Sequence, residues 1–273
     1  MKNKNRHIIK DQEDFFNQAS LHENAVSSKD DIFSKYANKE QVSSFKWLSD
    51  CKRILDYGCG TGTSIDVFLK HRKKQNYMIY GVDIAQLALK KAKNKYPQYT
   101  FYKIDKNKIP QIINDSMDAA YMLHVLHHSK NHIEMFREIH SKLKIDGKFL
   151  INDLSSNNPI NKTARSLFVH MPLFVKNRFS DDLVVGENIP EKYKVDIYTV
   201  LKQLQQVGFE IREVKYGHLF FFSFGWVDKF IPFSGLFLIR FIYDGMMKLE
   251  NYLLRYDLFQ KNTEVFVIKC IKK

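Results

Sequence analysis

Short apolar segments alternate with helical patterns over residues 53–152, and this alternation constrains the fold more than any other feature of the chain. Five apolar runs fit β-strands, namely Arg53–Asp56, Tyr77–Val82, Thr100–Ile104, Met117–Leu123 and Lys148–Asn152. Helical patterns lie between them, at Thr63–Lys73, Ile84–Asn94 and Asn131–Lys144. Strands joined through helices of this length wind right-handed into a parallel sheet. The sequence therefore predicts an α/β protein with an open, doubly wound, Rossmann-like sheet, and residues 51–154 form its core.

The flanking segments follow other patterns. Residues 1–50 carry apolar positions at helical spacing, which predicts helices that pack on the core. Residues 155–195 are irregular and are interpreted as a cap over the substrate. A helix at 196–207 ends at Gly208, a residue typical of helix C-termini, and a strand follows within 196–217. An aromatic insertion at 218–262 then separates this strand from a last one at 263–273.

Three glycines follow the first predicted strand at alternate positions, in Asp56-Tyr57-Gly58-Cys59-Gly60-Thr61-Gly62. Glycine lets a backbone turn tightly and approach a ligand, which then faces the amides at the start of the next helix. A dinucleotide fingerprint needs G-x-G-x-x-G, but position 63 is Thr. The loop therefore indicates a nucleotide-like ligand of another kind.

Acidic residues accompany the glycine loop. Asp56 precedes it, Asp83 ends the second predicted strand and Asp105 ends the third. The carboxyl ends of parallel strands line the crevice in which open α/β sheets bind ligands, and a carboxylate there can accept both hydroxyls of a ribose. Three acids in register with a glycine loop indicate a binding site rather than solvated loops.

These residues together resemble a known family. Ile54–Gly62 resembles the first motif of class I S-adenosylmethionine-dependent methyltransferases, and Asp83, Asp105 and Met117–His128 match the later motifs in order. Asp146-Gly147 stands where the family has Pro-Gly before its fifth strand. The resemblance covers about residues 45–155 and 196–217. It implies a mostly parallel seven-stranded sheet with an antiparallel last strand, S-adenosyl-L-methionine as cofactor and S-adenosyl-L-homocysteine as product.

The resemblance also implies roles for individual residues. Asp56 would lie near the amino group of the cofactor, Asp83 would hold the ribose hydroxyls, and Asp105 would accept from the adenine amino group. The other implied contacts come from the glycine backbone, from two apolar residues beside adenine and from a histidine near the sulfonium: Gly58, Gly60, Gly62, Ile84, Ile104 and His124. Lys106 departs from the small residue that is common after the adenine-binding acid.

Three histidines follow the fourth predicted strand, and they are candidates for catalysis. Methyl transfer is an in-line displacement in which the protein mainly positions the reactants, and a general base helps when the acceptor is a hydroxyl or an acidic carbon. Histidine suits that role. We favour His127 over His124 and His128, and a packing role for each stays open. No Cys or carboxylate completes a ligand set in this segment, so we expect no metal.

The aromatic insertion bears on the acceptor. Residues 218–262 hold nine of the 22 Phe, with Trp226 and three Tyr. The insertion is interpreted either as a packed cap, as the lining of a pocket for a hydrophobic acceptor, or as a membrane contact flanked by Lys229, Arg240, Lys248 and Arg255. We predict methyl transfer to oxygen or carbon of a small hydrophobic or lipid-like molecule. An RNA methyltransferase and a catalytically silent cofactor-binding or scaffold protein are the alternatives.

Charge and cysteine content bear on partners and location. The net charge is +13, and eleven Lys or Arg against two acids lie between positions 70 and 108. A single Arg and few interleaved aromatic residues there favour a solvated surface over nucleic-acid binding. Three cysteines without paired spacing, no export signal and no apolar run long enough to cross a bilayer predict a cytoplasmic protein. The oligomeric state stays open.

Overall fold

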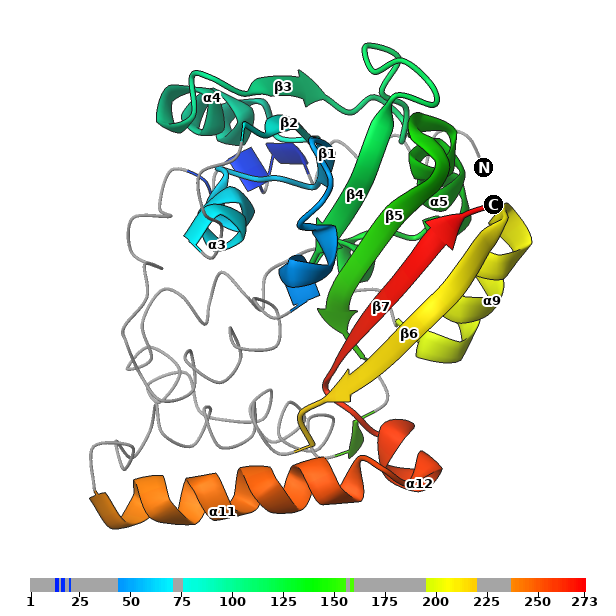
Figure 1. The fold of residues 1–273 in the computed structure, drawn as a ribbon. Coiled ribbons are helices and arrows are strands. Elements are labelled where there is room, and N and C mark those ends of the chain that lie inside the picture. The colour runs from blue at the N-terminus through cyan, green and yellow to red at the C-terminus, as the bar shows by residue number, and fades with distance from the viewer. Residues whose placement is uncertain are drawn as a thin grey trace.

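A seven-stranded sheet with helices on both faces forms the core of the protein, as the computed structural model shows (Figure 1). The structure describes residues 13–14, 16–17, 20, 44–70, 76–155, 158–159, 195–219 and 237–273. The strand order is β3-β2-β1-β4-β5-β7-β6. The strands are β1 (Arg53–Tyr57), β2 (Met78–Asp83), β3 (Thr100–Lys103), β4 (Met117–Leu123), β5 (Leu143–Leu154), β6 (Phe209–Gly217) and β7 (Val265–Lys272).

Strand directions confirm the predicted fold class. Strands β1 to β5 pair in parallel, whereas β7 lies between β5 and β6 and runs antiparallel to both. The carboxyl ends of β1, β2, β3 and β4 therefore meet at one edge of the sheet, together with the end of β5. This is the edge at which open α/β sheets bind their ligands.

The helices of the core are α3 (Thr63–Lys70), α4 (Gln86–Lys95), α5 (His132–Lys142) and α9 (Ile197–Val207). Local capping explains the bounds of α9. The side chain of Asp196 accepts from the Thr199 N–H at 2.9 Å, and Gly208 closes the helix with φ +109°. A side-chain acceptor at the start and a left-handed glycine at the end satisfy backbone groups that the helix leaves unpaired.

Two apolar clusters cover the two faces of the sheet. Helices α5 and α9 pack on one face, through residues such as Phe136 and Leu204. On the other face α3 packs together with the segment that contains the short helix η2 (Lys46–Leu48). Phe45 and Phe68 are fully buried there and form edge-to-face contacts at 5.4 Å between ring centroids. Earlier described residues of the N-terminal segment also contact the core: the Asn17 side chain accepts from the Leu87 N–H at 2.8 Å, and the centroids of the Phe16 and His128 rings are 4.9 Å apart.

Strand β5 starts earlier than the sequence predicts. Helix α5 ends at Lys142 rather than Lys144, and β5 begins at Leu143 rather than Lys148. Its pairing with β4 shifts between Met117 and Ala119, and Asp146 has φ +58°. The Asp-Gly pair therefore lies inside an irregular start of the strand. An extra loop of chain in one strand is a β-bulge, and a sequence cannot easily distinguish it from a turn.

The predicted cap lies largely outside the described residues, namely positions 156–157, 160–194 and 220–236. The described part of the aromatic insertion contains α11 (Phe237–Leu253) and α12 (Asp257–Gln260), for which the sequence analysis predicted no helix. Figure 1 shows α11 beyond the carboxyl end of β6. Among the described residues, no helix combines the length and the apolar character needed to cross a bilayer.

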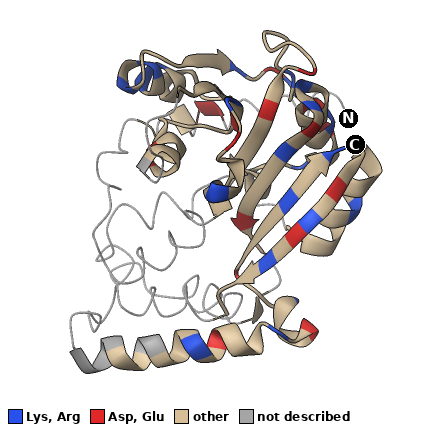
Figure 2. Cartoon of the chain, in the orientation of Figure 1, with Lys and Arg blue, Asp and Glu red and all other residues tan. Residues whose placement is uncertain are grey.

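Basic residues gather on α4, as Figure 2 shows. Several of their side chains have local partners. Lys95 pairs with Asp66 of α3, and the ammonium of Lys93 donates to the carbonyls of Pro97 and Tyr99 at 3.0 and 2.8 Å. Part of the positive charge therefore supports the fold around α4.

Candidate active site

The glycine loop leaves β1 with a backbone that other residues rarely adopt. Gly58, Gly60 and Gly62 have φ values of +80°, +52° and +88°. The N–H groups of Gly58 and Cys59 donate to the carbonyl of Val82 at 2.7 and 3.0 Å. These bonds tie the loop to the end of β2, and helix α3 starts directly after it.

Two of these glycines face different surroundings. A Cβ on Gly58 would lie 2.3 Å from Cγ2 of Val125, which belongs to the segment after β4. A Cβ on Gly60 would meet no described heavy atom within 4 Å. The first glycine therefore permits close packing between the loops after β1 and β4. The second lines an open cradle into which a ligand can fit.

Alanine variants of these two glycines should separate folding from cofactor binding. Gly58→Ala combines a clash with Val125 and a positive φ, and we expect it to lower the free energy of unfolding by about 2–3 kcal/mol. Gly60→Ala should cost only about 1 kcal/mol for its backbone conformation. It should nevertheless weaken S-adenosylmethionine binding, because its methyl group fills the cradle. Melting temperatures with and without the cofactor test both points. A full cofactor-induced shift in Gly60→Ala would contradict the assignment of the cradle.

Asp83 connects the glycine loop to the next helix. Its Oδ2 accepts from the Gly60 N–H at 2.8 Å, and its Oδ1 accepts from the Ala85 N–H at 2.9 Å. A carboxylate has about four acceptor positions, and it is the type of group that can accept from ribose hydroxyls. Ile84, beside it, is half-buried and has surface left for an apolar contact. The predicted ribose and adenine contacts therefore fit this corner of the sheet.

Asp105 lies in a tight turn after β3. Asp105 and Lys108 exchange two backbone hydrogen bonds, at 3.1 and 2.8 Å, and the intervening Lys106 and Asn107 both have positive φ. The side chain of Asp105 is exposed, whereas Ile104 is buried and donates its N–H to the Asp83 carbonyl at 2.8 Å. Lys106 thus belongs to the turn itself, and the Asp105 carboxylate is free to meet a ligand from solution.

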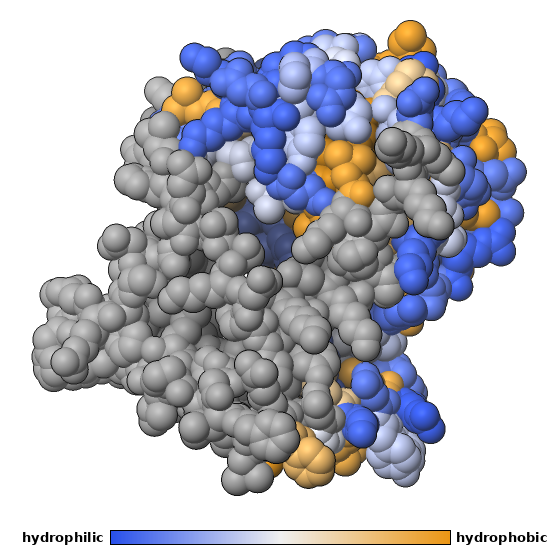
Figure 3. Space-filling view, turned by 60° about the vertical axis from the view of Figure 1, so that its left-hand side comes forward, coloured by the Kyte–Doolittle hydropathy of each residue, from blue (hydrophilic) through white to orange (hydrophobic). Residues whose placement is uncertain are grey.

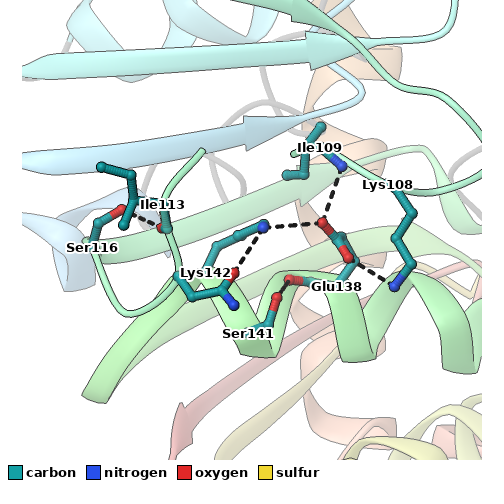
Figure 4. A network of polar contacts seen from close by, with 8 residues as sticks. Lys108, Ile109, Ile113, Ser116, Glu138, Ser141 and Lys142 are labelled. Atoms are coloured by element: carbon teal, nitrogen blue, oxygen red, sulfur yellow. Dashed lines mark hydrogen bonds and ion pairs between the residues drawn. The ribbon is translucent and has the colours of Figure 1, made fainter. Parts of the chain in front are cut away.

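Glu138 of α5 holds this turn in place, as Figure 4 shows. Its carboxylate accepts from the Ile109 N–H at 3.0 Å and pairs with the ammonium groups of Lys108 and Lys142 at 3.0 and 3.3 Å. The two lysines and the backbone amide hold the pKa of Glu138 below its usual value, although burial opposes them. The ionised carboxylate therefore links the loop after β3 to α5.

Asp56 is buried beneath the loop. Its Oδ2 accepts from Ser64 Oγ at 2.5 Å and from the Tyr121 hydroxyl at 2.8 Å. Burial raises the pKa of Asp56 to about 7, and the two hydrogen bonds offset this only in part. Ionised or protonated, the carboxyl links β1, α3 and β4. Whether it also meets the amino group of the cofactor stays a prediction.

The raised pKa of Asp56 predicts a pH-dependent stability. The group titrates at 3.8 in an unperturbed chain and near 7 in the folded protein. Its ionisation therefore costs folding nothing below about pH 4, increasingly more up to about pH 7, and a constant amount above that, on the order of 4 kcal/mol. Asp56→Asn keeps an acceptor for Ser64 and Tyr121 and removes this cost. We expect the variant to gain stability over wild type between about pH 5 and about pH 8 in urea unfolding. If the free energy of unfolding of wild type and of Asp56→Asn changed with pH in parallel, the raised pKa of Asp56 would be contradicted.

The three histidines lie together after β4. His124 has φ +56° and donates its N–H to the Asn152 carbonyl at 2.8 Å. His127 and His128 are on the short helix η3 (Leu126–His128), with ring centroids 3.9 Å apart. The centroids of His124 and His127 are 6.4 Å apart. Because Val125 packs against Gly58, the whole segment lies next to the glycine loop.

A fully buried carboxylate, Asp153 of β5, organises this segment. Its Oδ1 contacts Nδ1 of His127 at 2.6 Å, and its Oδ2 accepts from the Leu126 N–H at 2.6 Å. Burial would raise the pKa of Asp153, but its hydrogen bonds with His127 and with the Leu154 N–H help to hold it below its usual value. An ionised Asp153 accepts a hydrogen bond from the Nδ1–H of His127, and this leaves Nε2 of His127 as the basic nitrogen.

The sequence analysis missed Asp153, although a signal was present. Asp153 directly follows the predicted strand Lys148–Asn152, so it stands at the carboxyl end of a parallel strand like the three acids that were singled out. Its partner His127 is 26 positions away, and only the pairing of β4 with β5 brings them together. No group of three potential metal ligands is arranged for an ion in the described part of the chain.

Fold and site together define a class of protein. It is a Rossmann-like α/β protein with a glycine loop that is bonded to Asp83 and with a histidine–aspartate pair at the same edge of the sheet. Residues 55–149 match a family model described as a methyltransferase domain. Over these residues the chain is similar to the class I S-adenosylmethionine-dependent methyltransferases, as the resemblance in its motifs implied. S-adenosylmethionine is the cofactor of this family.

Similarity to individual proteins agrees with this family. The chain is 27% identical over 128 residues to carboxy-S-adenosyl-L-methionine synthase of Nautilia profundicola, covering 45% of this chain and 53% of the synthase. It is 26% identical over 191 residues to juvenile hormone acid O-methyltransferase of Bombyx mori, covering 67% and 66%. The chain thus spans less than two thirds of each relative. An S-adenosylmethionine-dependent methyltransferase from Mesorhizobium loti has the same fold, with a TM-score of 0.53 at 16% identity over 90% of this chain and 100% of that one.

Proposed function

We propose that the protein transfers a methyl group from S-adenosylmethionine to an oxygen or an acidic carbon of a small hydrophobic molecule. The observation that carries this proposal is the contact between His127 and the buried Asp153 at 2.6 Å, next to the glycine loop. A base of this kind is useful when the acceptor must lose a proton, and an amine needs it less. The pair therefore favours a hydroxyl or a carbon acid as the acceptor.

Residues of the chain have separate tasks in this reaction. When bound, the cofactor supplies an activated methyl group on its sulfonium. Asp83 and the glycine backbone hold the cofactor in place. His124 lies in the same segment after β4 as the proposed base, His127. Nε2 of His127 takes the proton from the acceptor, and Asp153 keeps the imidazole in the required tautomer and stabilises its positive charge. The remaining task is alignment of the acceptor with the methyl group.

The hydrophobic character of the acceptor rests on the C-terminal region. The described part of the aromatic insertion places α11 beyond the carboxyl end of β6, on the side where the binding edge of the sheet lies (Figure 1). Leu219, at the end of β6, is buried there. The name of the Bombyx mori relative specifies an oxygen acceptor, which supports oxygen in this chain too.

A search for the acceptor tests the proposal. Extracts fractionated by polarity are incubated with the protein and with S-adenosylmethionine that carries a labelled methyl group, and products are found by mass spectrometry. We expect a labelled product, one methylene heavier than its precursor, in the apolar fractions. Asp83→Ala is the matched control, because it should lack cofactor binding. A labelled product in RNA, a transferred group other than methyl, or no product at all would overturn the proposed function.

A further inference from the structure

Helix α11 and the turn after it carry an exposed apolar stripe. Its members on α11 are spaced by four, four and three residues and therefore share one face of the helix: Phe241, Gly245, Leu249 and Tyr252. Tyr256, in the turn after α11, continues the stripe, because its ring centroid is 5.8 Å from that of Tyr252. The exposed fractions of the large side chains are 74% for Phe241, 54% for Leu249, 52% for Tyr252 and 50% for Tyr256. No described atom would lie within 4 Å of a Cβ on Gly245. Ile242 and Leu258, 47% and 68% exposed, extend the stripe at its edges.

The opposite face of α11 is bonded to the core, and the stripe therefore faces away from the core. Glu250 is 2% exposed, and its Oε2 accepts from the Leu219 N–H at 2.7 Å. The Asn158 amide donates to the carbonyls of Leu219 and Asn262 at 3.0 and 2.7 Å. A buried carboxylate with partners on another element specifies one orientation of a helix, because rotating the helix would take this acceptor away from the buried Leu219 N–H.

The border of the stripe is basic. Within residues 245–261 three basic side chains are exposed, namely Lys248, Arg255 and Lys261. One acidic side chain in this range is exposed, that of Asp257. The Arg255 guanidinium lies 5.8 Å from the centre of the Tyr252 ring. Figure 3 shows apolar surface beside hydrophilic surface at the lower end of the molecule, where Figure 1 places α11 and α12. Aromatic residues with a polar tip next to Lys and Arg are typical of helices that lie in the interface of a bilayer.

We infer that this stripe docks on an anionic membrane surface, with α11 parallel to the plane of the bilayer. A helix of 17 residues is about 25 Å long, and none of the described helices is suited to crossing a bilayer, so the contact is peripheral. A second copy of the chain fits less well. A two-fold dimer would place the same basic border of two chains, each with a net charge of +13, against itself. Anionic lipids neutralise that border instead.

Flotation of the full-length protein with vesicles tests the inference. One set of vesicles is phosphatidylcholine, and the other contains phosphatidylglycerol as well. We expect binding to the anionic set, weakened by high salt. Phe241→Ser with Leu249→Ser should reduce that binding about tenfold or more, because the lost apolar area lies in the contact. Ile113→Ser with Ile145→Ser is the matched control, because these side chains are 75% and 65% exposed outside α11, and it should bind like wild type.

The outcomes separate this inference from the proposed function. Asp83→Ala lacks cofactor binding under that function but should float like wild type, so a failure of catalysis leaves the membrane contact intact. Equal binding of both double variants, or no binding of wild type to anionic vesicles at low salt, would overturn the inference. A dimer that dissociates in Phe241→Ser with Leu249→Ser, without vesicle binding by wild type, would assign the stripe to a second copy.

Discussion

Replacing Asp83 by Ala should abolish most of the rise in melting temperature that S-adenosylmethionine or S-adenosylhomocysteine gives to the wild-type protein. A ligand stabilises a fold by binding the native state in preference to the unfolded chain, so the shift reports affinity. The variant loses the acceptor for two ribose hydroxyls, and hydrogen bonds to a charged group contribute about 1.5–3 kcal/mol each. It also releases the Gly60 N–H, which Asp83 holds at 2.8 Å. We therefore expect affinity to fall by about 100-fold or more.

Asp83→Asn and a distant control sharpen this experiment. An amide cannot accept from both the Gly60 and the Ala85 N–H groups, since one of its two ends is itself a donor. This variant should lose affinity although its shape is nearly unchanged. Glu210→Gln removes a carboxylate of β6 that pairs with Arg212 and with Lys273, the residue after β7, and should keep the full shift. A full shift in Asp83→Ala would remove the ribose site from this corner.

Replacing His127 by Gln should lower kcat by about 10²- to 10⁴-fold once an acceptor is known, because a positioned base contributes that much to proton transfer. The KM for S-adenosylmethionine should change little. Asp153→Asn should have an effect of the same order, since an amide that accepts from the Leu126 N–H presents a donor to Nδ1 of His127 and reverses its tautomer.

A structural role for the pair predicts a different result. In that case both variants would lower the melting temperature and leave kcat per folded molecule unchanged. Nitrogen NMR of the His127 ring provides a readout without an acceptor, since the proton should reside on Nδ1 in wild type and move to Nε2 in Asp153→Asn. An unchanged kcat in His127→Gln would exclude base catalysis by this residue.

Much of the fold follows from local patterns. Strand β4 has the predicted bounds Met117–Leu123, and α9 ends at the predicted Gly208. Apolar periodicity and a left-handed glycine act over a few residues, so a sequence displays them directly. The start of β5 was wrong because Asp146-Gly147 is turn-like by composition, whereas pairing with β4 draws the segment into the sheet.

The candidate site also has a part that local sequence patterns predict and a part that depends on contacts between distant residues. The glycines and the acids Asp83 and Asp105 were predicted because each stands beside a strand end, and the structure ties Asp83 to Gly60. The selection of His127 among three histidines depends on Asp153, which lies on the next strand of the sheet. The environment of Asp56 depends likewise on Tyr121, 65 positions away.

The sheet, the glycine loop and the edge of the sheet that carries the candidate site were predicted correctly in outline, because they depend on spacing along the chain. The folded structure was needed to show which histidine has a carboxylate partner, why burial raises the pKa of Asp56 to about 7 and which apolar side chains of α11 remain exposed. The physical reason is that burial and hydrogen bonding depend on neighbours brought together by folding. In α11, for example, the buried contact of Glu250 with the Leu219 N–H sets which face of the helix is turned to the core and which apolar side chains remain exposed.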